Sequence, residues 1–403
     1  MRSPYMLDFP IDEYVSRKSN LVAALDSHGL DGIILTTEEN TRYFTGFQSI
    51  VWDSKVSTPA FLVVNRNGDW LMVGSHSSIG TMSITSCMDG GDLFYYDRAA
   101  LDPSVPKTYF EAITAAVGKL IPTGGRVGME TGLGFRVHMN YPNLRDLLGY
   151  LEGKSMEHVD AADLLWGIRS IKSPRELEVM RKVCAINCAL YKAAYDSVRA
   201  GVTTERDVFH VMGIEAFRLG CEKILNMGIR AGLDRDPHTN CPSSSRVIGS
   251  GHEGEVLMID GGPIYKGYYS DIIRTGVVGK PTQRQLDLHD IAVEACYVGL
   301  GHIRPGASIS EATRAVDEYI DKKGMREYNI TYSWIGHGIG MDVHEFPGIE
   351  ISSKDVFKPG MCFAVEPCIR TPDGMFGIEQ NIAVNESGYE LLTPFRHDLF
   401  SIG

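Results

Sequence analysis

The sequence predicts two domains: an α/β domain at the N-terminus, followed by an α+β domain with internal pseudo-two-fold symmetry. A chain of 403 residues is long enough for two hydrophobic cores. Strand-like and helix-like patterns alternate through the first part, which is typical of an α/β fold. In the second part, two segments that begin 105 residues apart, at Arg199 and Arg304, share one pattern.

The N-terminal domain is predicted from the order of its apolar patterns. A helical periodicity from Tyr14 to Leu30 precedes the strand-like run DGIILTT. Two further strand-like runs follow, PAFLVV and DWLMVG, and helical patterns return near Tyr109–Leu120 and Leu144–Leu151. We expect this domain to comprise residues 1–165.

A second domain, residues 166–403, is predicted from a helix start near Gly167–Arg175. In the run IKSPRELEVMRKV, Ser173 is suited to the N-cap, Pro174 to the first helical position and Glu176 to a capping box.

The repeated segments of this domain each consist of a short turn, an amphipathic helix and a glycine stop. They read RAGVTTERDVFHVMGIEAFRLG and RPGASISEATRAVDEYIDKKG. Their identity is weak, so the repeat needs support from the spacing of other residues.

A first predicted β-hairpin carries two aspartates. In VLMIDGGPIYKGYYSDIIRT, strand-like runs flank a turn at 265–267. If Ile264 pairs with Gly267, Asp260 lies directly opposite Asp271 on one face of the hairpin.

A second predicted hairpin carries two glutamates. In MCFAVEPCIRTPDGMFGIEQNIAV, the turn signal is Pro372-Asp373-Gly374. Glu366 and Glu379 lie symmetrically about that turn. Glu366 lies 106 residues beyond Asp260, and Glu379 lies 108 residues beyond Asp271.

Three histidines accompany the carboxylates. His344 lies 106 residues beyond His238, and each of the two precedes the first carboxylate of its half by 22 residues. His337, within WIGHGIGMDVHE, is the candidate imidazole ligand, because the glycines beside it let the backbone approach a metal or substrate closely.

Four carboxylates brought together repel one another unless cations lie between them. Oxygen ligands suit Mn²⁺, Mg²⁺ or Co²⁺, and an added imidazole admits Zn²⁺ or Fe²⁺. Two cations about 3.5–4 Å apart would neutralise the cluster and activate a water molecule. The spacing therefore predicts two divalent metal ions. We expect Mn²⁺ first, with Co²⁺, Zn²⁺ or Fe²⁺ as alternatives.

Simpler interpretations apply to each residue alone. A single acidic side chain is usually a solvated charge, and a lone histidine is usually structural. Arg274 and Arg370 lie near the carboxylates in the sequence and offer structural ion pairs instead of a metal. The matched pairs within apolar strands favour the metal site, because a buried carboxylate without a partner is costly.

At these residues the chain resembles a known family. The segment from about Ile171 to Thr393, with IDGGPIYKGYYSDIIRT, GHGIGMDVHE, VEP and IEQ, is similar to the pita-bread hydrolases: prolidase, aminopeptidase P, methionine aminopeptidase and creatinase. The N-terminal part, with YFTGF, resembles the creatinase-like first domain of prolidase, aminopeptidase P and creatinase. The resemblance implies a creatinase-like α/β domain and a C-terminal pita-bread domain.

The resemblance also implies roles for individual residues. The implied metal ligands are Asp260, Asp271, His337, Glu366 and Glu379. Glu366 is also the implied proton shuttle, and His344 and His238 match the histidines that line the substrate site in the prolidase-like branch.

Three features depart from the prolidase pattern. Gly377 stands where prolidases often carry an arginine, two residues before the last ligand. Cys368 stands where a glycine usually follows VEP. The loop GLDRDPHTNCPSSS around His238 also differs, and these changes bear on the substrate more than on the metal site.

The first expected function is an Xaa-Pro dipeptidase or aminopeptidase that cleaves the amide C–N bond of a small peptide by metal-assisted hydrolysis. The alternative is a hydrolase or lyase of a non-peptide small metabolite, similar to creatinase, ectoine hydrolase and sulfonium lyase relatives. A non-catalytic binding module is a third class, and the retention of all five ligands argues against it.

Composition excludes several partners. The net charge of −12 argues against nucleic acid and anionic membranes. No apolar run reaches the length of a signal-peptide core or a membrane span. We therefore expect a cytoplasmic protein, and the family resemblance implies a homodimer. The eight cysteines form no CxxC pair, so we expect no disulfide framework.

Overall fold

The computed structural model describes residue 1 and residues 3–54, 60–235 and 241–403. These residues form two compact units, Met1–Ile168 and Arg169–Gly403. None of the described helices is long and apolar enough to cross a membrane.

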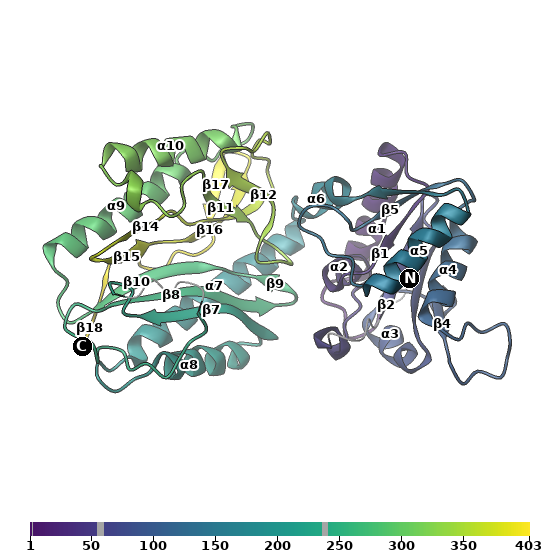
Figure 1. The fold of residues 1–403 in the computed structure, drawn as a ribbon, viewed down its shortest axis with the longest axis horizontal. Coiled ribbons are helices and arrows are strands. Elements are labelled where there is room, and N and C mark those ends of the chain that lie inside the picture. The colour runs from purple at the N-terminus through teal and green to yellow at the C-terminus, as the bar shows by residue number, and fades with distance from the viewer. Residues whose placement is uncertain (2, 55–59, 236–240) are drawn as a thin grey trace. The chain divides into compact units, whose positions relative to one another are not determined.

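The N-terminal unit is built on a six-stranded mixed sheet with the strand order β4-β3-β2-β1-β5-β6 (Figure 1). The strands are β1 (Gly32–Leu35), β2 (Ala60–Asn65), β3 (Trp70–Ser75), β4 (Leu93–Tyr96), β5 (Arg126–Met129) and β6 (Glu157–Asp160). β1 is antiparallel to β2 and parallel to β5. The predicted strand-like runs correspond to β1, β2 and β3.

In the described part of this unit, the sheet is accompanied by the α-helices α1 (Ile11–Ser27), α2 (Glu38–Thr45), α3 (Ile79–Thr85), α4 (Tyr109–Leu120), α5 (Tyr141–Gly153) and α6 (Ala162–Arg169). Apolar residues of α4 and α5 such as Ile113, Val117 and Leu147 share a core with Ile34 and Val63 of the sheet. The predicted helices at 14–30, 109–120 and 144–151 are confirmed as α1, α4 and α5, and the α/β class is confirmed.

The C-terminal unit begins with the capped helix that the sequence predicts. α7 (Pro174–Ser197) has Ser173 as its N-cap, and the Ser173 and Glu176 side chains form the reciprocal capping box. The predicted helix start is therefore confirmed, with Pro174 at the first helical position.

This unit contains two similar halves. The first comprises α7, α8 (Glu205–Arg218), β7 (Lys223–Ala231), β8 (Val256–Tyr265), β9 (Tyr268–Tyr269) and β10 (Ile272–Val278). The second comprises α9 (Gln283–Leu300), α10 (Ile309–Lys322), β11 (Trp334–Gly338), β12 (Glu345–Glu350), β13 (Cys362–Val365), β14 (Cys368–Thr371), β15 (Gly374–Gly377), β16 (Gln380–Asn385) and β17 (Gly388–Leu391), and β18 (Phe400–Ile402) closes the chain.

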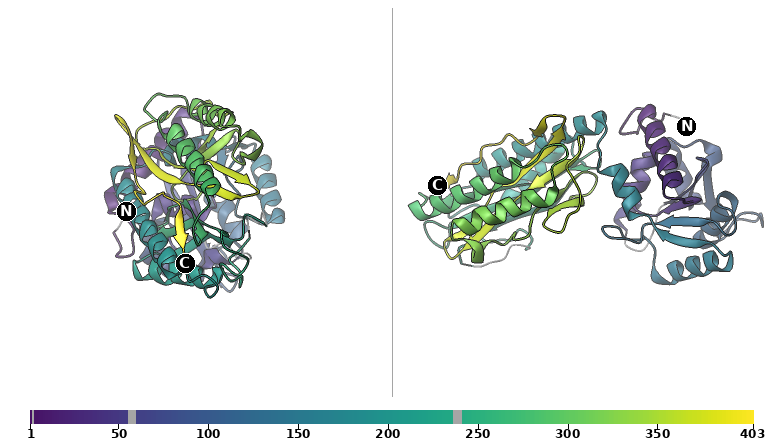
Figure 2. Two further views of the ribbon diagram at one scale, coloured as in Figure 1. Left: turned by 90° about the vertical axis from the view of Figure 1, so that its left-hand side faces the viewer. Right: turned by 90° about the horizontal axis from the view of Figure 1, so that it is seen from above.

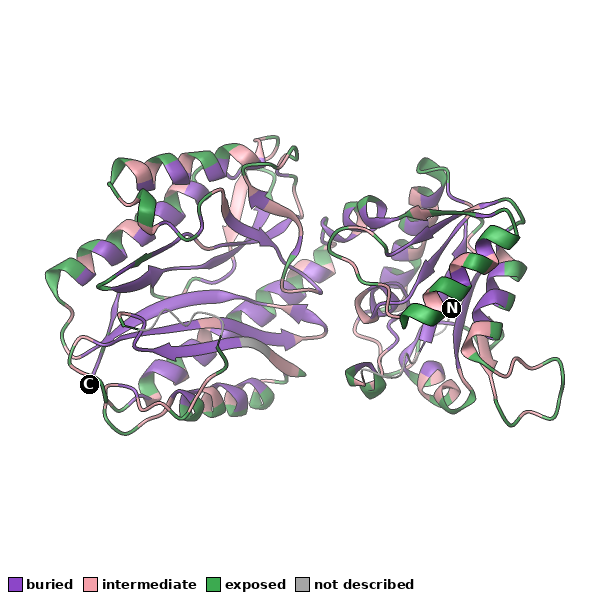
Figure 3. Ribbon diagram, viewed as in Figure 1, coloured by how far each residue is buried: buried purple, intermediate pink, exposed green. Residues whose placement is uncertain are grey.

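The two halves form layers with helices outside and sheets inside. Figure 1 shows the sheets of this unit between α8 and the pair α9 and α10, which lie side by side in the view from above in Figure 2. The sheet β18-β10-β8-β7 packs on α7 and α8, and the sheet β12-β11-β13-β16-β17 packs on α9 and α10. The strands are largely buried and the outer helix faces are exposed (Figure 3). The predicted pseudo-two-fold α+β domain is confirmed.

The register predicted for the first hairpin is wrong by two residues. Tyr265 pairs with Tyr268, which leaves Lys266 and Gly267 as a two-residue loop with φ of 52° and 77°. A loop with both central residues at positive φ is a type I′ hairpin turn. Asp260 therefore lies opposite Ile273 rather than Asp271. A shift of two residues preserves the face on which a side chain points, so both aspartates remain on one face.

The register predicted for the second hairpin is confirmed. Cys368 pairs with Gly377 and Thr371 with Gly374, about the turn at Pro372-Asp373. The paired segment ends before it reaches Glu366 and Glu379, which follow the same symmetry just outside the ladder.

Candidate metal centre

Three of the predicted ligands converge from different strands. Asp271 lies directly before β10, His337 lies on β11 and Glu379 lies directly before β16. One ligand atom from each lies within 4.8 Å of the others. All three residues are buried, with exposed fractions of 6%, 3% and 0%. The pseudo-symmetric halves thus contribute to one common site.

The donor atoms of this group make no hydrogen bond with the described residues. Among the described residues, Asp271 Oδ1, His337 Nε2 and both carboxylate oxygens of Glu379 are buried without a hydrogen bond. A buried polar group left unsatisfied costs about 1–3 kcal/mol, and more when it is charged. A divalent cation fits this donor set, because it would satisfy two carboxylates and one imidazole together.

The tautomer of His337 suits a metal ligand. Its Nδ1 lies 2.9 Å from the backbone oxygen of Gly338, which only accepts hydrogen bonds. Nδ1 therefore carries the proton, and the lone pair of Nε2 faces the carboxylates. Nε2 lies 3.1 Å from Glu366 Oε1 and 3.8 Å from Glu379 Oε1.

The other two predicted ligands lie beside this group. Glu366 contacts His337 as described, with 15% of its side chain exposed. Asp260 Oδ2 lies 3.2 Å from Nη2 and 3.4 Å from Nη1 of Arg230, and its side chain keeps 29% exposure. The tight three-residue group does not include either of them.

The electrostatics are those of crowded carboxylates. Burial raises the pKa of Asp260 to about 7, with Arg230 opposing the shift and Glu366 adding to it. Burial and the neighbouring carboxylates raise the pKa of Asp271 and of Glu379 well above their ordinary values. Such carboxyls retain their protons to a higher pH than free carboxyls do, and a cation that binds them competes with those protons.

Arg230 was not found from the sequence. In the pairing of β7 with β8, Gly228 lies opposite Asp260 and Arg230 lies opposite Met258. A Cβ on Gly228 would lie 1.9 Å from Arg230 Nη2, so the glycine leaves the space through which the guanidinium reaches Asp260. The pattern Gly-x-Arg opposite the aspartate is the signal that could have revealed this contact.

Among the described contacts, neither Arg274 nor Arg370 forms an ion pair with the candidate carboxylates. Arg274 is fully buried and donates to backbone oxygens, among them those of Ile273 and Glu379, each at 2.7 Å. Arg370 is exposed. Within the described part of the chain, neither arginine therefore forms the structural ion pair that the sequence offered as an alternative to a metal. Arg274 instead fixes the backbone that carries Glu379.

Asn381 anchors the backbone of Asp271 and was also missed. Its Oδ1 accepts from Asp271 N at 3.0 Å and from Ser270 Oγ at 2.9 Å, and its Nδ2 donates to Asp271 O at 2.5 Å. Because Asn381 lies on β16, two residues after Glu379, this contact links the candidate ligands of the two halves.

The predicted substrate histidines differ in what the structure describes. His344 is exposed at the end of the loop after β11, with its ring centroid 4.2 Å from that of His337. Desolvation and the neighbouring His337 lower the pKa of His344 to about 4, which keeps the imidazole neutral at physiological pH. His238 lies outside the described residues.

Comparison with known proteins agrees with this geometry. Residues 178–386 match the model of metallopeptidase family M24, and residues 17–171 match the creatinase/prolidase N-terminal domain. The chain therefore belongs to metallopeptidase family M24.

Its relatives include Xaa-Pro peptidases. The Xaa-Pro dipeptidase of Pyrococcus furiosus is 25% identical, over 95% of this chain and 99% of that protein. An uncharacterized peptidase of Bacillus subtilis, YqhT, is 28% identical, over 91% of this chain and 94% of the relative. The structure of an Xaa-Pro dipeptidase from Bacillus anthracis superposes with a TM-score of 0.80 at 26% identity, covering 96% of this chain and 100% of that one. The chain is thus a metallopeptidase similar to Xaa-Pro peptidases.

Proposed function

We propose that this protein hydrolyses the amide bond before proline in Xaa-Pro dipeptides or in short peptides that begin with Xaa-Pro. The observation that carries the proposal is the buried group of Asp271, His337 and Glu379, whose ligand atoms make no hydrogen bond with the described residues, in an M24 fold. The similarity to Xaa-Pro dipeptidases supports the substrate class.

In this proposal the C-terminal domain, residues 166–403, holds two divalent cations, of which Mn²⁺ is the first choice. The ligands are Asp260, Asp271, His337, Glu366 and Glu379. When bound, such cations supply Lewis-acid polarisation of the scissile carbonyl and a lower pKa for the attacking water.

We assign the remaining steps of the reaction to Glu366, His344 and His238. Glu366, which lies 3.1 Å from His337 and is more exposed than Glu379, takes a proton from the attacking water and delivers it to the leaving nitrogen. His344, neutral and exposed, donates a hydrogen bond to the oxygen that becomes negative in the transition state. His238 is assigned to the substrate carboxylate or the oxyanion. We further propose that the protein is a cytoplasmic homodimer.

A panel of Xaa-Pro dipeptides and Xaa-Pro-initiated tripeptides, assayed with the metal content measured on the same sample, tests the proposal. We expect cleavage before proline and no cleavage of matched Xaa-Ala peptides. A protein that binds metal but cleaves none of the panel would overturn the substrate assignment while leaving the metal centre intact.

A second candidate is a hydrolase or lyase of a non-peptide metabolite. The observation that favours it is the pair Cys368 and Gly377, which replaces the prolidase glycine and arginine and leaves no guanidinium at this position. Turnover of small amide or amidine metabolites in the absence of peptide cleavage would establish this alternative.

A further inference from the structure

The loop that carries His344 wraps around the buried carboxylate of Glu345. The loop spans residues 339–344 between β11 and β12, and the next residue, Glu345, is 3% exposed. Its Oε1 accepts from the backbone nitrogens of Met341 at 2.9 Å and Asp342 at 3.3 Å. Glu345 therefore folds back under the loop and holds its shape from within.

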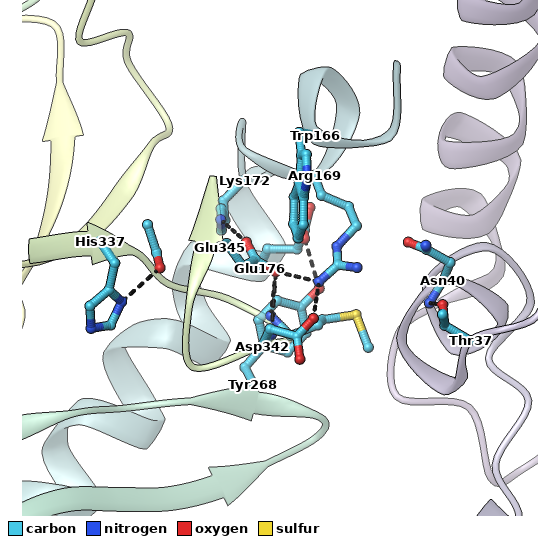
Figure 4. A network of polar contacts seen from close by, with 12 residues as sticks. Thr37, Asn40, Trp166, Arg169, Lys172, Glu176, Tyr268, His337, Asp342 and Glu345 are labelled. Atoms are coloured by element: carbon cyan, nitrogen blue, oxygen red, sulfur yellow. Dashed lines mark hydrogen bonds and ion pairs between the residues drawn. The ribbon is translucent and has the colours of Figure 1, made fainter. Parts of the chain in front are cut away.

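Two cations hold this carboxylate from the other side. Arg169 Nη2 donates to Glu345 Oε1 at 2.5 Å, and Lys172 Nζ donates to Oε2 at 2.8 Å. Arg169 also lies 3.3 Å from Asp342 Oδ2, so two cations face two carboxylates (Figure 4). The Glu345, Arg169 and Lys172 side chains are each 1–2% exposed, which makes charge-assisted hydrogen bonds of this kind strong and geometrically demanding.

The glycines of GHGIG make room for this arrangement. A Cβ on Gly340 would lie 2.5 Å from Glu345 Oε2, so the carboxylate fits under the loop only because residue 340 has no side chain. The backbone oxygen of Gly340 also accepts from Tyr269 N at 2.8 Å. Tyr269 lies two residues before Asp271, so the loop is tied to the strand that leads to the metal centre.

His344 depends on the loop for its position. Among the described residues, no hydrogen bond holds its imidazole, which is exposed and meets the ring of His337. The direction of the side chain is therefore set by the backbone of the loop, and the backbone is set by the contacts of Glu345.

We propose that Glu345, clamped by Arg169 and Lys172, is a positioning residue that places the His344 imidazole beside the metal centre. The clamp acts through His344 and does not touch substrate or metal. This inference rests on the proposed function, because it assigns His344 a part in turnover.

A double-mutant cycle between Glu345 and His344 tests the clamp in the metal-loaded enzyme. Glu345→Gln is expected to lower kcat by about 10- to 100-fold, the usual effect of losing an outer support, with KM and metal content nearly unchanged. His344→Ala is then expected to cost at least about fivefold less in the Glu345→Gln background than in the wild type. Independent, multiplicative losses would overturn the proposal.

Further variants separate positioning from general stability. Lys172→Arg keeps the cation and is expected to retain most of the wild-type kcat, whereas Lys172→Met is expected to reproduce the loss. Glu350→Gln, the same change on the same strand β12, serves as the matched control. If Glu345→Gln does not fold, Lys172→Met crossed with His344→Ala provides the cycle, and an unchanged kcat in folded Lys172→Met would overturn the proposal.

A chemical probe tests the clamp without any substrate. Diethylpyrocarbonate modifies exposed imidazoles, and His344 can be followed by peptide mass spectrometry against the exposed His158 in the same molecule. We expect Glu345→Gln to change the modification rate of His344 severalfold and to leave that of His158 unchanged. An unchanged His344 rate would contradict the clamp, whereas failure of the dipeptide panel alone would contradict only the proposed function.

Discussion

A Cβ on Gly377 would lie 2.2 Å from the Sγ of Cys368, its direct partner across β14 and β15. Cys368 and Gly377, two of the positions at which the chain departs from the prolidase pattern, are therefore sterically coupled. The cysteine occupies space that any side chain at position 377 would need.

This contact predicts that an arginine cannot be restored at position 377 alone. Gly377→Arg is expected to destabilise the protein by about 1–3 kcal/mol through overpacking, and Cys368→Gly/Gly377→Arg is expected to recover most of that loss. Denaturant unfolding of the metal-loaded proteins measures both. Gly149→Arg, at a glycine with no neighbour within 4 Å of its Cβ position, is the control. Equal stability of the single and double variants would refute the coupling.

Removal of Glu379 is predicted to remove metal and activity together. Both of its carboxylate oxygens are buried and accept no hydrogen bond from the described residues, so Glu379→Ala deletes a proposed ligand from the centre of the group. Elemental analysis and peptide turnover on one preparation check this expectation. Glu386→Ala, at an exposed position in the turn after β16, should retain both properties. Full metal content and full turnover in Glu379→Ala would contradict the assignment of Glu379 as a metal ligand.

Metal binding is predicted to release protons. The pKa of Asp260 is raised to about 7, and burial and the neighbouring carboxylates raise the pKa of Asp271 and of Glu379 well above their ordinary values. Before a cation binds, these carboxyls therefore hold protons to a higher pH than free carboxyls do. The apparent affinity for Mn²⁺ should therefore increase with pH through the neutral range. Isothermal titration calorimetry in buffers of different ionisation enthalpy measures the number of protons. A binding enthalpy independent of the buffer would contradict the prediction.

The buried clamp is predicted to contribute to stability in a defined pH range. Burial alone would raise the pKa of Glu345, but Lys172 and Arg169 outweigh it and lower the pKa to about 2. A depressed folded-state pKa gives a contribution that is present above the unfolded value, about 4.3, and is lost as the pH falls toward 2. The shift corresponds to about 3 kcal/mol.

Glu345→Gln should therefore be less stable than the wild type at pH 7, and the difference should shrink between about pH 4.5 and 2. Urea unfolding across that range measures it. Glu390→Gln removes the partially exposed pair with Arg181 and should cost no more than about 1 kcal/mol. A stability difference that does not vary with pH would show that the ionised carboxylate of Glu345 is not the stabilising group.

Local patterns predicted the α/β class of the first domain, the capped helix α7 and the two hairpins near the candidate ligands. Apolar periodicity and the cap at Ser173 predicted the helices, because these signals depend on residues a few positions apart. The turn at Pro372-Asp373 predicted its register correctly. The register of the first hairpin was not predicted correctly. The chain forms a two-residue loop at Lys266-Gly267 with positive φ at both residues, and the sequence Tyr-Lys-Gly is not a typical signal for such a loop.

What the sequence by itself determined was the set of acidic residues and histidines and their placement in two matched halves. Tertiary structure decided which of them meet. Asp271, His337 and Glu379 converge on one site. Asp260 pairs with Arg230, whose guanidinium occupies the space that a side chain at Gly228 would fill. Glu345 binds Lys172 and Arg169, which lie 173 and 176 residues before it in the sequence. The physical reason is that such contacts depend on which strands pair, on the space left by glycines at those pairings and on the packing of segments far apart in the sequence. A local pattern does not specify these relationships.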